Sequence, residues 1–283
     1  MTESSAKSGT QSGPRLRLGA YETWWQGQQI VPGATLRDRL RSLEDLGYEF
    51  IQLTRGTFAG DYQHVKEAFR DSPIKIAVAG VGGPSLAAST PEERAEAIRC
   101  LRRSLEIAAE VGALGAPLAR QHTIPDLSPL WTSNELARAL IVHALREVAS
   151  QCADLGVSVI LEPINSYESS FIQTLAEASS ICEEVGGGTL KILADFYHMQ
   201  LSESDIEKAV IDAAPHISFV HVADSNRCEP GTGHADFRPL FRALKRIKYD
   251  GYVSLESKIL AEDKRQMLAD VRDFLRKVWN EVE

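Results

Sequence analysis

The feature that most constrains the fold of this chain is an alternation of short apolar runs with longer amphipathic stretches, which begins near residue 15 and continues to the C-terminal end. Several runs, such as KIAVAGV, LKILAD and ISFVHVAD, are apolar almost without interruption. Such runs are typical of parallel strands that are buried on both faces. We expect eight strands: Arg15–Tyr21, Phe50–Arg55, Lys75–Val81, Ala116–Arg120, Ser158–Glu162, Leu190–Asp195, Ile217–Ala223 and Gly251–Glu256.

A helix is predicted after each strand, and the boundary residues support this. Thr90 precedes Pro91, with Glu93 three residues after Thr90, which is a capping signature with proline at the first helical position. Gly112 and Gly156 stand where a left-handed C-cap is expected. The expected helices are Leu36–Leu46, Tyr62–Arg70, Pro91–Val111, Ser133–Leu155, Leu175–Val185, Glu203–Ala214, Arg238–Ile247 and Ala261–Val282.

Eight strands that each lead into a helix predict an α/β fold, a single (β/α)8 TIM barrel, which uses about 250 residues. The chain has 283 residues, so we expect one barrel domain over residues 15–283. An open doubly wound sheet is the alternative that the pattern leaves. Residues 1–14 are small and polar, and we expect them to form a disordered tail.

The composition of the chain disfavours some kinds of binding partner. The formal net charge is −8 and no basic cluster stands out, which disfavours a nucleic-acid partner. No apolar run approaches the roughly 18 residues of a membrane helix, and residues 1–14 lack the apolar middle of a signal peptide. The four cysteines form no CxxC pair and are interpreted as reduced thiols. We therefore expect a cytoplasmic protein without a nucleic-acid or membrane partner.

Four residues of metal-ligand type stand at the carboxyl ends of the last four predicted strands, where barrel enzymes place their active sites. They are Glu162, Asp195, His221 and Glu256. Buried carboxylates need a positive partner, and these strand ends contain no lysine. Any one of the four alone is more often a helix cap, a solvated carboxylate or a buried histidine. Together they favour one divalent cation, Mn²⁺ first, with Mg²⁺, Co²⁺ and Zn²⁺ as alternatives.

A second set of polar side chains lies in the loops that follow these strands. Glu168, His198 and Arg227 have groups that suit the hydroxyls and carbonyl of a small substrate. Individually they fit a loop carboxylate, a capping histidine and a surface arginine equally well. In the turn-rich segment EPGTGHADF, His234 and Asp236 are candidates to reach the site, and a purely structural loop is the alternative.

The motifs LEPINSYE, ADFYHM, HVADSNRCEPGTGHADF and GYVSLES resemble the xylose-isomerase-like barrel superfamily, and within it the D-tagatose 3-epimerase, D-psicose 3-epimerase and hydroxypyruvate isomerase group. The resemblance covers residues 158–257, whereas the first half matches in architecture only. It implies that Glu162 and Glu256 each act as metal ligand and acid/base, and that Asp195 and His221 are metal ligands. By analogy with the family, we expect a homo-oligomer, a dimer or a tetramer.

The same resemblance implies that Glu168, His198 and Arg227 hold substrate oxygens. Ser166 departs from the family, because many members carry arginine there. The two tryptophans in the first half suit either core packing or a wall beside a sugar ring. The residues near expected strand ends that match no firm motif are Glu22, Trp24, Trp25, Arg55, Gln121 and His122.

The expected activity is that of a metal-dependent sugar isomerase or epimerase, which removes a proton next to a carbonyl of a sugar or keto-sugar and passes through an enediolate. A lyase or dehydratase that acts on a 3-keto sugar or a cyclitol is the main alternative, because it needs the same proton abstraction. An apurinic-site endonuclease shares the barrel but needs extra histidines for three zinc ions, and KIAVAGVGG offers none. A non-catalytic subunit that keeps the metal site is a further alternative.

Overall fold

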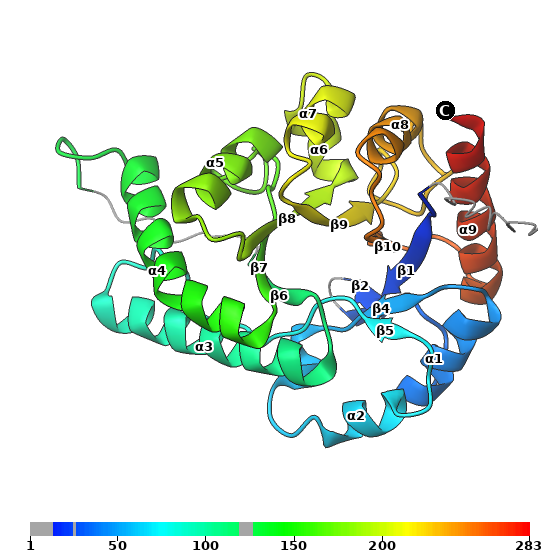
Figure 1. The fold of residues 1–283 in the computed structure, drawn as a ribbon. Helices are drawn as coiled ribbons and strands as arrows, with labels where there is room; N and C mark the ends of the chain where they lie inside the picture. The colour runs from blue at the N-terminus through cyan, green and yellow to red at the C-terminus, as the bar shows by residue number, and fades with distance from the viewer. Residues whose placement is uncertain (1–13, 25–26, 119–126) are drawn as a thin grey trace, which may run out of the picture.

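A computed structural model describes residues 14–24, 27–118 and 127–283. Its centre is a ring of parallel strands surrounded by helices (Figure 1). The ring strands are β1 (Arg17–Tyr21), β4 (Phe50–Gln52), β5 (Lys75–Ile76), β6 (Gly115–Leu118), β7 (Ser158–Leu161), β8 (Leu190–Asp195), β9 (Ile217–Val222) and β10 (Tyr252–Leu255). Hydrogen-bonded neighbours follow the order β5-β4-β1-β10-β9-β8-β7-β6, so the strands lie around the ring in chain order.

The ring closes between β5 and β6 through main-chain hydrogen bonds beyond the regular strands. Ala79 N donates to Gly115 O over 3.1 Å, and Leu114 N donates to Ala77 O over 3.0 Å. The predicted strand 75–81 is therefore too long, although its main chain still pairs as far as Ala79. The TIM barrel is confirmed, and the open doubly wound sheet is wrong.

The helices differ from prediction mainly after β8. The predicted helix Glu203–Ala214 is present but shorter, over Ile206–Asp212. An additional helix, Phe196–Ser202, was not predicted and begins directly after the strand, because the Asp195 carboxylate accepts hydrogen bonds from Tyr197 N (2.8 Å) and His198 N (3.3 Å). The helices are α1 (Leu36–Asp45), α2 (Gln63–Phe69), α3 (Pro91–Val111), α4 (Ser133–Leu155), α5 (Leu175–Val185), α6 (Phe196–Ser202), α7 (Ile206–Asp212), α8 (Arg238–Arg246) and α9 (Lys264–Glu281).

The predicted helix boundaries hold where side chains cap them. Thr132 and Thr174 form reciprocal capping boxes with the glutamates three residues later, at the starts of α4 and α5. Gly112 ends α3 with a φ of 69°, in the left-handed region that glycine adopts without strain. These local signals therefore set where the long outer helices begin and end.

The interior of the barrel is filled by one side chain from each of several strands, close to the carboxyl end of each strand. Phe50, Ile160, Leu193 and Phe219 pack together there, with the rings of Phe50 and Phe219 5.9 Å apart. Because side chains alternate along a strand, the residue two positions later points to the same interior space, one layer higher. This packed layer is the floor on which the polar strand ends stand.

A short antiparallel hairpin, β2 (Thr23–Trp24) with β3 (Gln28–Gln29), was not predicted. Gln28 fastens it to the loop after β10: its amide nitrogen donates to Ile259 O over 2.7 Å, and its amide oxygen accepts from Ile259 N over 3.0 Å. The hairpin therefore places Trp24 next to the carboxyl ends of the barrel strands.

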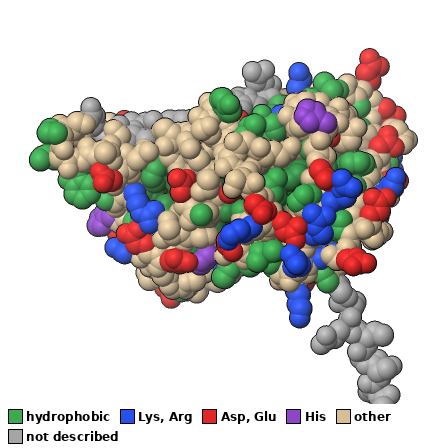
Figure 2. Space-filling view, turned by 90° about the horizontal axis from the view of Figure 1, so that it is seen from above, with side chains coloured by type: hydrophobic (Ala, Val, Ile, Leu, Met, Phe, Trp, Pro, Cys, Tyr) green, Lys and Arg blue, Asp and Glu red, His purple; other side chains and the backbone are tan. Residues whose placement is uncertain are grey.

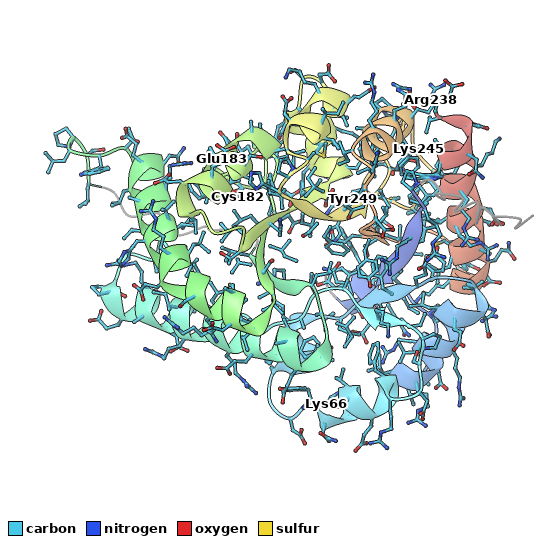
Figure 3. The ribbon with its side chains drawn as sticks, in the orientation of Figure 1. Lys66, Cys182, Glu183, Arg238, Lys245 and Tyr249 are labelled. Carbon is cyan, nitrogen blue, oxygen red and sulfur yellow. The ribbon has the colours of Figure 1, made fainter. Side chains whose placement is uncertain are left out.

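Acidic and basic side chains are interspersed on the face shown in Figure 2. The four cysteines are free thiols, and Cys182 on α5 is buried (Figure 3). Within the described residues, none of the helices combines the length and apolar character that a membrane crossing requires. The expected disordered tail lies outside the described residues, apart from Pro14.

The close approach of β6 and β7 predicts that Gly115→Ala is destabilising. A Cβ at position 115 would lie 1.9 Å from Ser158 O, a main-chain atom that cannot rotate away. We expect a loss of about 3 kcal/mol in the free energy of unfolding, the range of overpacked cores. Urea unfolding measures it, and Gly56→Ala, where a Cβ meets nothing within 4 Å, is the control. Equal stability of the two variants would contradict the packing.

Candidate active site

The four predicted ligand side chains meet at the carboxyl end of the barrel. One ligand-type atom from each lies within 4.8 Å of the other three. Glu162 and Glu256 follow β7 and β10 directly, while Asp195 ends β8 and pairs in register with His221 on β9. Each stands two residues after an interior position, so the alternation that fills the floor also turns these four groups inward.

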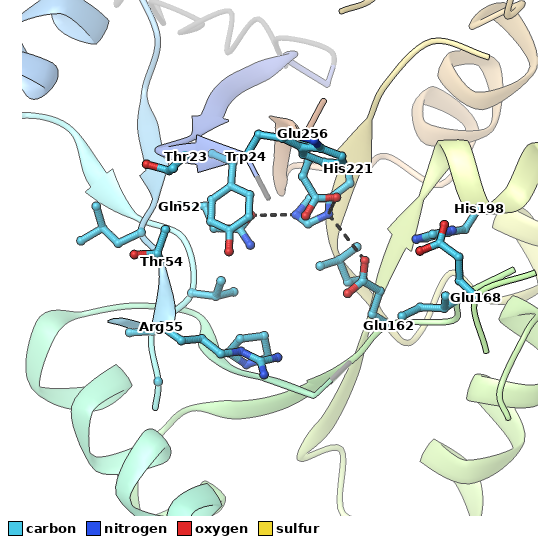
Figure 4. Close-up of a pocket in the computed structure, with 18 of the residues that line it drawn as sticks. Thr23, Trp24, Gln52, Thr54, Arg55, Glu162, Glu168, His198, His221 and Glu256 are labelled. Atoms are coloured by element: carbon cyan, nitrogen blue, oxygen red, sulfur yellow. Dashed lines mark hydrogen bonds and ion pairs between the residues drawn. The ribbon is translucent and has the colours of Figure 1, made fainter. Parts of the chain in front are cut away.

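Gln52 sets the orientation of the His221 ring. It ends β4, is buried, and its Oε1 lies 2.7 Å from His221 Nε2 (Figure 4). Because an amide oxygen only accepts, Nε2 carries a proton. The other ring nitrogen, Nδ1, lies 3.2 Å from Glu256 Oε2, 3.7 Å from Asp195 Oδ2 and 3.8 Å from Glu162 Oε1. A histidine held in this way is the arrangement that metal sites use.

Two buried atoms at the centre of this set make no hydrogen bond, namely His221 Nδ1 and Asp195 Oδ2, although Arg227 Nη1 lies 2.9 Å from Asp195 Oδ2 as an ion pair. Buried polar atoms without hydrogen bonds are costly. Both are donor atoms that bind divalent cations, and both face Glu162 and Glu256. The residues present therefore fit a metal ion.

Arg227 pairs with two of the carboxylates, which corrects the expectation that they lack a positive partner within the protein. Its Nη1 donates to Asp195 Oδ1 over 3.0 Å and its Nη2 to Glu256 Oε2 over 2.6 Å. The guanidinium carbon lies 4.4 Å from the centre of the Tyr197 ring and 5.4 Å from that of Trp24. Three carboxylates and one guanidinium leave a net charge of −2 when His221 is neutral, which is the charge that one divalent cation balances.

The carboxylates on the two sides of the site differ in acidity. Burial, and then the neighbouring Glu256, raise the pKa of Glu162 to about 7. Burial also acts to raise the pKa of Glu256, but His221 and Arg227 outweigh it and hold this pKa below its usual value. Burial opposes a charge on His221, yet Glu256 and Asp195 raise its pKa to about 10. Two carboxylates with separated pKa values are the arrangement of an acid and a base.

His198 and Glu168 lie next to the metal-ligand set and share one partner. The Asn165 side-chain nitrogen lies 2.7 Å from His198 Nδ1 and 3.2 Å from Glu168 Oε1. Because this nitrogen donates, Nδ1 accepts and His198 Nε2 carries the proton, 3.8 Å from Asp195 Oδ2. Burial lowers the pKa of His198, which keeps the ring neutral.

A cavity of about 900 Å³ opens over these groups. Of the residues that matched no motif, Trp24 and Arg55 line it, whereas Glu22 instead pairs with Arg39 at 3.1 Å. His234 contacts Ser225, and Asp236 pairs with Arg238. Neither residue lines the cavity. These contacts agree with the alternative that their loop is purely structural. Trp25, Gln121 and His122 lie outside the described residues.

Sequence reasoning missed Gln52, Asn165 and Tyr21. Gln52 ends a predicted strand and Asn165 lies in the motif LEPINSYE, so position alone could have indicated both. Tyr21 ends β1 and lines the cavity. Burial, followed by the charge of Glu256, raises its pKa to about 12, so its hydroxyl remains a hydrogen-bond donor.

Comparison with known proteins gives consistent results. The model of a protein family described as "Xylose isomerase-like TIM barrel" matches residues 40–278 of this chain. A 3-dehydro-D-guloside 4-epimerase of Escherichia coli (strain K12) is 31% identical over 257 residues, covering 89% of this chain and 97% of the relative. A ketose 3-epimerase of Arthrobacter globiformis is 29% identical, and the match covers 92% of this chain and 90% of the relative. The apo crystal structure of an E. coli 3-keto-D-glucoside 4-epimerase superposes with a TM-score of 0.81 at 27% identity, over 93% of this chain and 100% of that one.

Metal binding is expected to stabilise the fold, because the cation adds positive charge among three carboxylates and gives His221 Nδ1, which makes no hydrogen bond, a partner. Mn²⁺ at about 100 times its Kd contributes about 2.7 kcal/mol, which raises Tm by about 5 °C or more. Differential scanning fluorimetry with and without a chelator measures this. Asp195→Asn retains an N-cap side chain for α6 but should lose the rise in Tm with Mn²⁺. The control Asp212→Asn, at an exposed position of α7, should keep this rise in Tm. An unshifted wild-type Tm would contradict the metal site.

Gln52→Leu should weaken Mn²⁺ binding about tenfold or more, because the His221 ring loses the acceptor that fixes its proton on Nε2. Titration calorimetry gives the Kd. The matched control is Gln151→Leu, which removes a side-chain amide that donates to Arg102 O on the outside of the barrel. A Kd within twofold of wild type for Gln52→Leu would show that Gln52 does not orient the ring.

Proposed function

This chain belongs to the xylose isomerase-like TIM barrel family, and we propose that it is an epimerase that inverts the carbon next to the ring carbonyl of a 3-keto-glycoside. It is an enzyme of the sugar epimerase and isomerase type. The 3-keto-glycoside is supported by two E. coli relatives, a 3-dehydro-D-guloside 4-epimerase and a 3-keto-D-glucoside 4-epimerase, which cover 89% and 93% of this chain. Inversion at C4 of such a substrate requires a base and an acid on opposite faces of the ring.

The observation that carries this proposal is the placement of Glu162 and Glu256 on either side of His221 Nδ1, at 3.8 and 3.2 Å, with pKa values moved in opposite directions. An isomerase that moves one proton between neighbouring carbons with a single base needs only one such carboxylate. Two carboxylates of unequal acidity that both line one cavity suit removal of a proton from one face and its return to the other.

Mn²⁺ is the preferred candidate for the divalent cation, and its proposed ligands are Glu162, Asp195, His221 and Glu256. When bound, the cation would act as a Lewis acid that favours loss of the proton next to the carbonyl. Arg227 holds Asp195 and Glu256 in place, and the protonated Nε2 of His198 and the Tyr21 hydroxyl are placed to donate to substrate oxygens. Glu168 and Arg227 complete the proposed substrate contacts.

In the proposed reaction, a Glu256 carboxylate oxygen takes the C4 proton, and the electron pair of the C4–H bond moves to the C3 carbonyl to give an enediolate. Glu162, whose pKa is raised to about 7 by burial and by Glu256, enters the proposed reaction in its acid form and gives its proton to C4 from the opposite face. The reverse reaction exchanges the two roles. The packed floor and the cavity walls hold the ring between the two groups.

We further propose that the protein is cytoplasmic and assembles as a homo-oligomer. Four free thiols suit a reducing compartment. Large apolar side chains are exposed just before α4, where Leu127, Leu130 and Trp131 are 51%, 84% and 48% accessible. Exposed apolar groups of this size favour an interface with a second copy of the chain.

The two-base reaction predicts a pattern of deuterium uptake. NMR of a methyl 3-keto-glucoside in D2O should show deuterium at C4 of both epimers with the wild-type enzyme. Glu162→Gln and Glu256→Gln should each lose about 10²–10⁴-fold in epimerisation. Each variant should retain exchange for one epimer only, and the two variants should retain opposite ones.

Metal content, measured on the same samples, separates lost chemistry from lost metal, and Glu44→Gln on the exposed face of α1 is the control. Near-normal epimerisation by both active-site variants would overturn the assignment. Release of water or methanol from the substrate would instead identify the enzyme as a lyase.

A further inference from the structure

The cavity extends well beyond the reach of the metal-ligand set. Its volume of about 900 Å³ lies near the upper end of the range for drug-sized ligands, about 300–1,000 Å³. The ligand set occupies the wall formed by β7 to β10. The opposite wall is formed by residues after β4 and β5, and Figure 4 shows Thr54 and Arg55 across the opening from Glu162 and His198. A glycoside whose ring lies at the ligand set has space for its aglycone on this far side.

Two glycines form part of the far wall of the cavity. Gly80 and Gly83 line it, and a Cβ at either position would lie 2.8 Å from Ser104 Cβ or 2.7 Å from Cys100 Cβ on α3. The main chain at these two glycines therefore packs directly against α3, and it lines the cavity without a side chain at either position. A recess of about 60 Å³ adjoins here, sharing Arg55, Gly83 and Pro117 with the cavity, and its remaining lining is largely apolar.

Arg55 introduces a positive charge into this otherwise neutral wall. Among the described residues that line the cavity, the arginines are Arg55 and Arg227, and Arg227 is engaged by Asp195 and Glu256. Arg55 forms no ion pair with any described residue, although the chain has a net charge of −8. Its side chain reaches toward the middle of the opening in Figure 4.

We propose that Arg55 is a specificity residue that binds a carboxylate on the aglycone of the glycoside substrate. This inference rests on the proposed function. The guanidinium donates two parallel N–H groups in the geometry that a carboxylate accepts. The glycine wall and the recess beside Pro117 receive the apolar body of the aglycone, so an aromatic acid linked to the sugar fits both features.

Two glycosides that differ only in this charge test the proposal: the 3-keto-β-glucosides of phenol and of 4-hydroxybenzoate. Wild-type enzyme should favour the carboxylate compound about tenfold in kcat/KM, mainly through KM, which corresponds to about 1.4 kcal/mol. The preference should weaken between ionic strengths of about 0.01 M and about 1 M, over which the screening length falls from about 30 Å to about 3 Å. Arg55→Gln should abolish the preference and Arg55→Lys should keep part of it.

The control Arg99→Gln removes a charge from the outer face of α3, where Arg99 pairs with Glu96, and should leave the preference intact. Calorimetric binding of the two parent glucosides, which need no turnover, gives the same comparison independently. Equal affinity of wild type for both, or an equal loss on both in Arg55→Gln, would refute the role of Arg55. Absence of C4 deuterium exchange with either substrate would refute the proposed function, and the binding ratio would still decide the question of Arg55.

Discussion

The structure depends on the confinement of three carboxylates and one imidazole at the carboxyl end of the barrel strands. Such groups repel one another, and removing the partner of one buried charge costs about 3–5 kcal/mol. Arg227 supplies one positive charge, through contacts of 3.0 Å to Asp195 and 2.6 Å to Glu256. An excess of negative charge remains, and His221 Nδ1 beside these carboxylates makes no hydrogen bond. A fold that accepts this cost has a site organised for a cation.

The barrel makes this confinement possible by a simple repeat. Interior residues such as Leu193 and Phe219 form the packed floor, and Asp195 and His221 follow two positions later on the same strands. The floor fixes each strand end laterally, and the Asp195 cap starts α6 at once, so the polar groups have little freedom. The proposed contact with the aglycone lies in the other half of the ring, where Arg55 lines the cavity.

Much of this was predictable from the sequence, because strand ends in a barrel meet at one place. Buried runs and capping residues identified the eight strands, the long helices and all four ligand candidates. Interactions between distant segments were not predictable, since periodicity does not report them. Gln52 meets His221 across 169 residues, and the Gln28 amide pairs with Ile259 across 231 residues. The ion pair of Arg227 also depends on the conformation of its loop, where φ is 59°.

The most direct test of the central claim is anomalous diffraction from crystals soaked in Mn²⁺. We expect one strong anomalous peak about 2.0–2.3 Å from Glu162, Asp195 and Glu256 oxygens and from His221 Nδ1, with His221 Nε2 still bound to Gln52. No peak at this position, or a peak coordinated by other side chains while these four point apart, would contradict it.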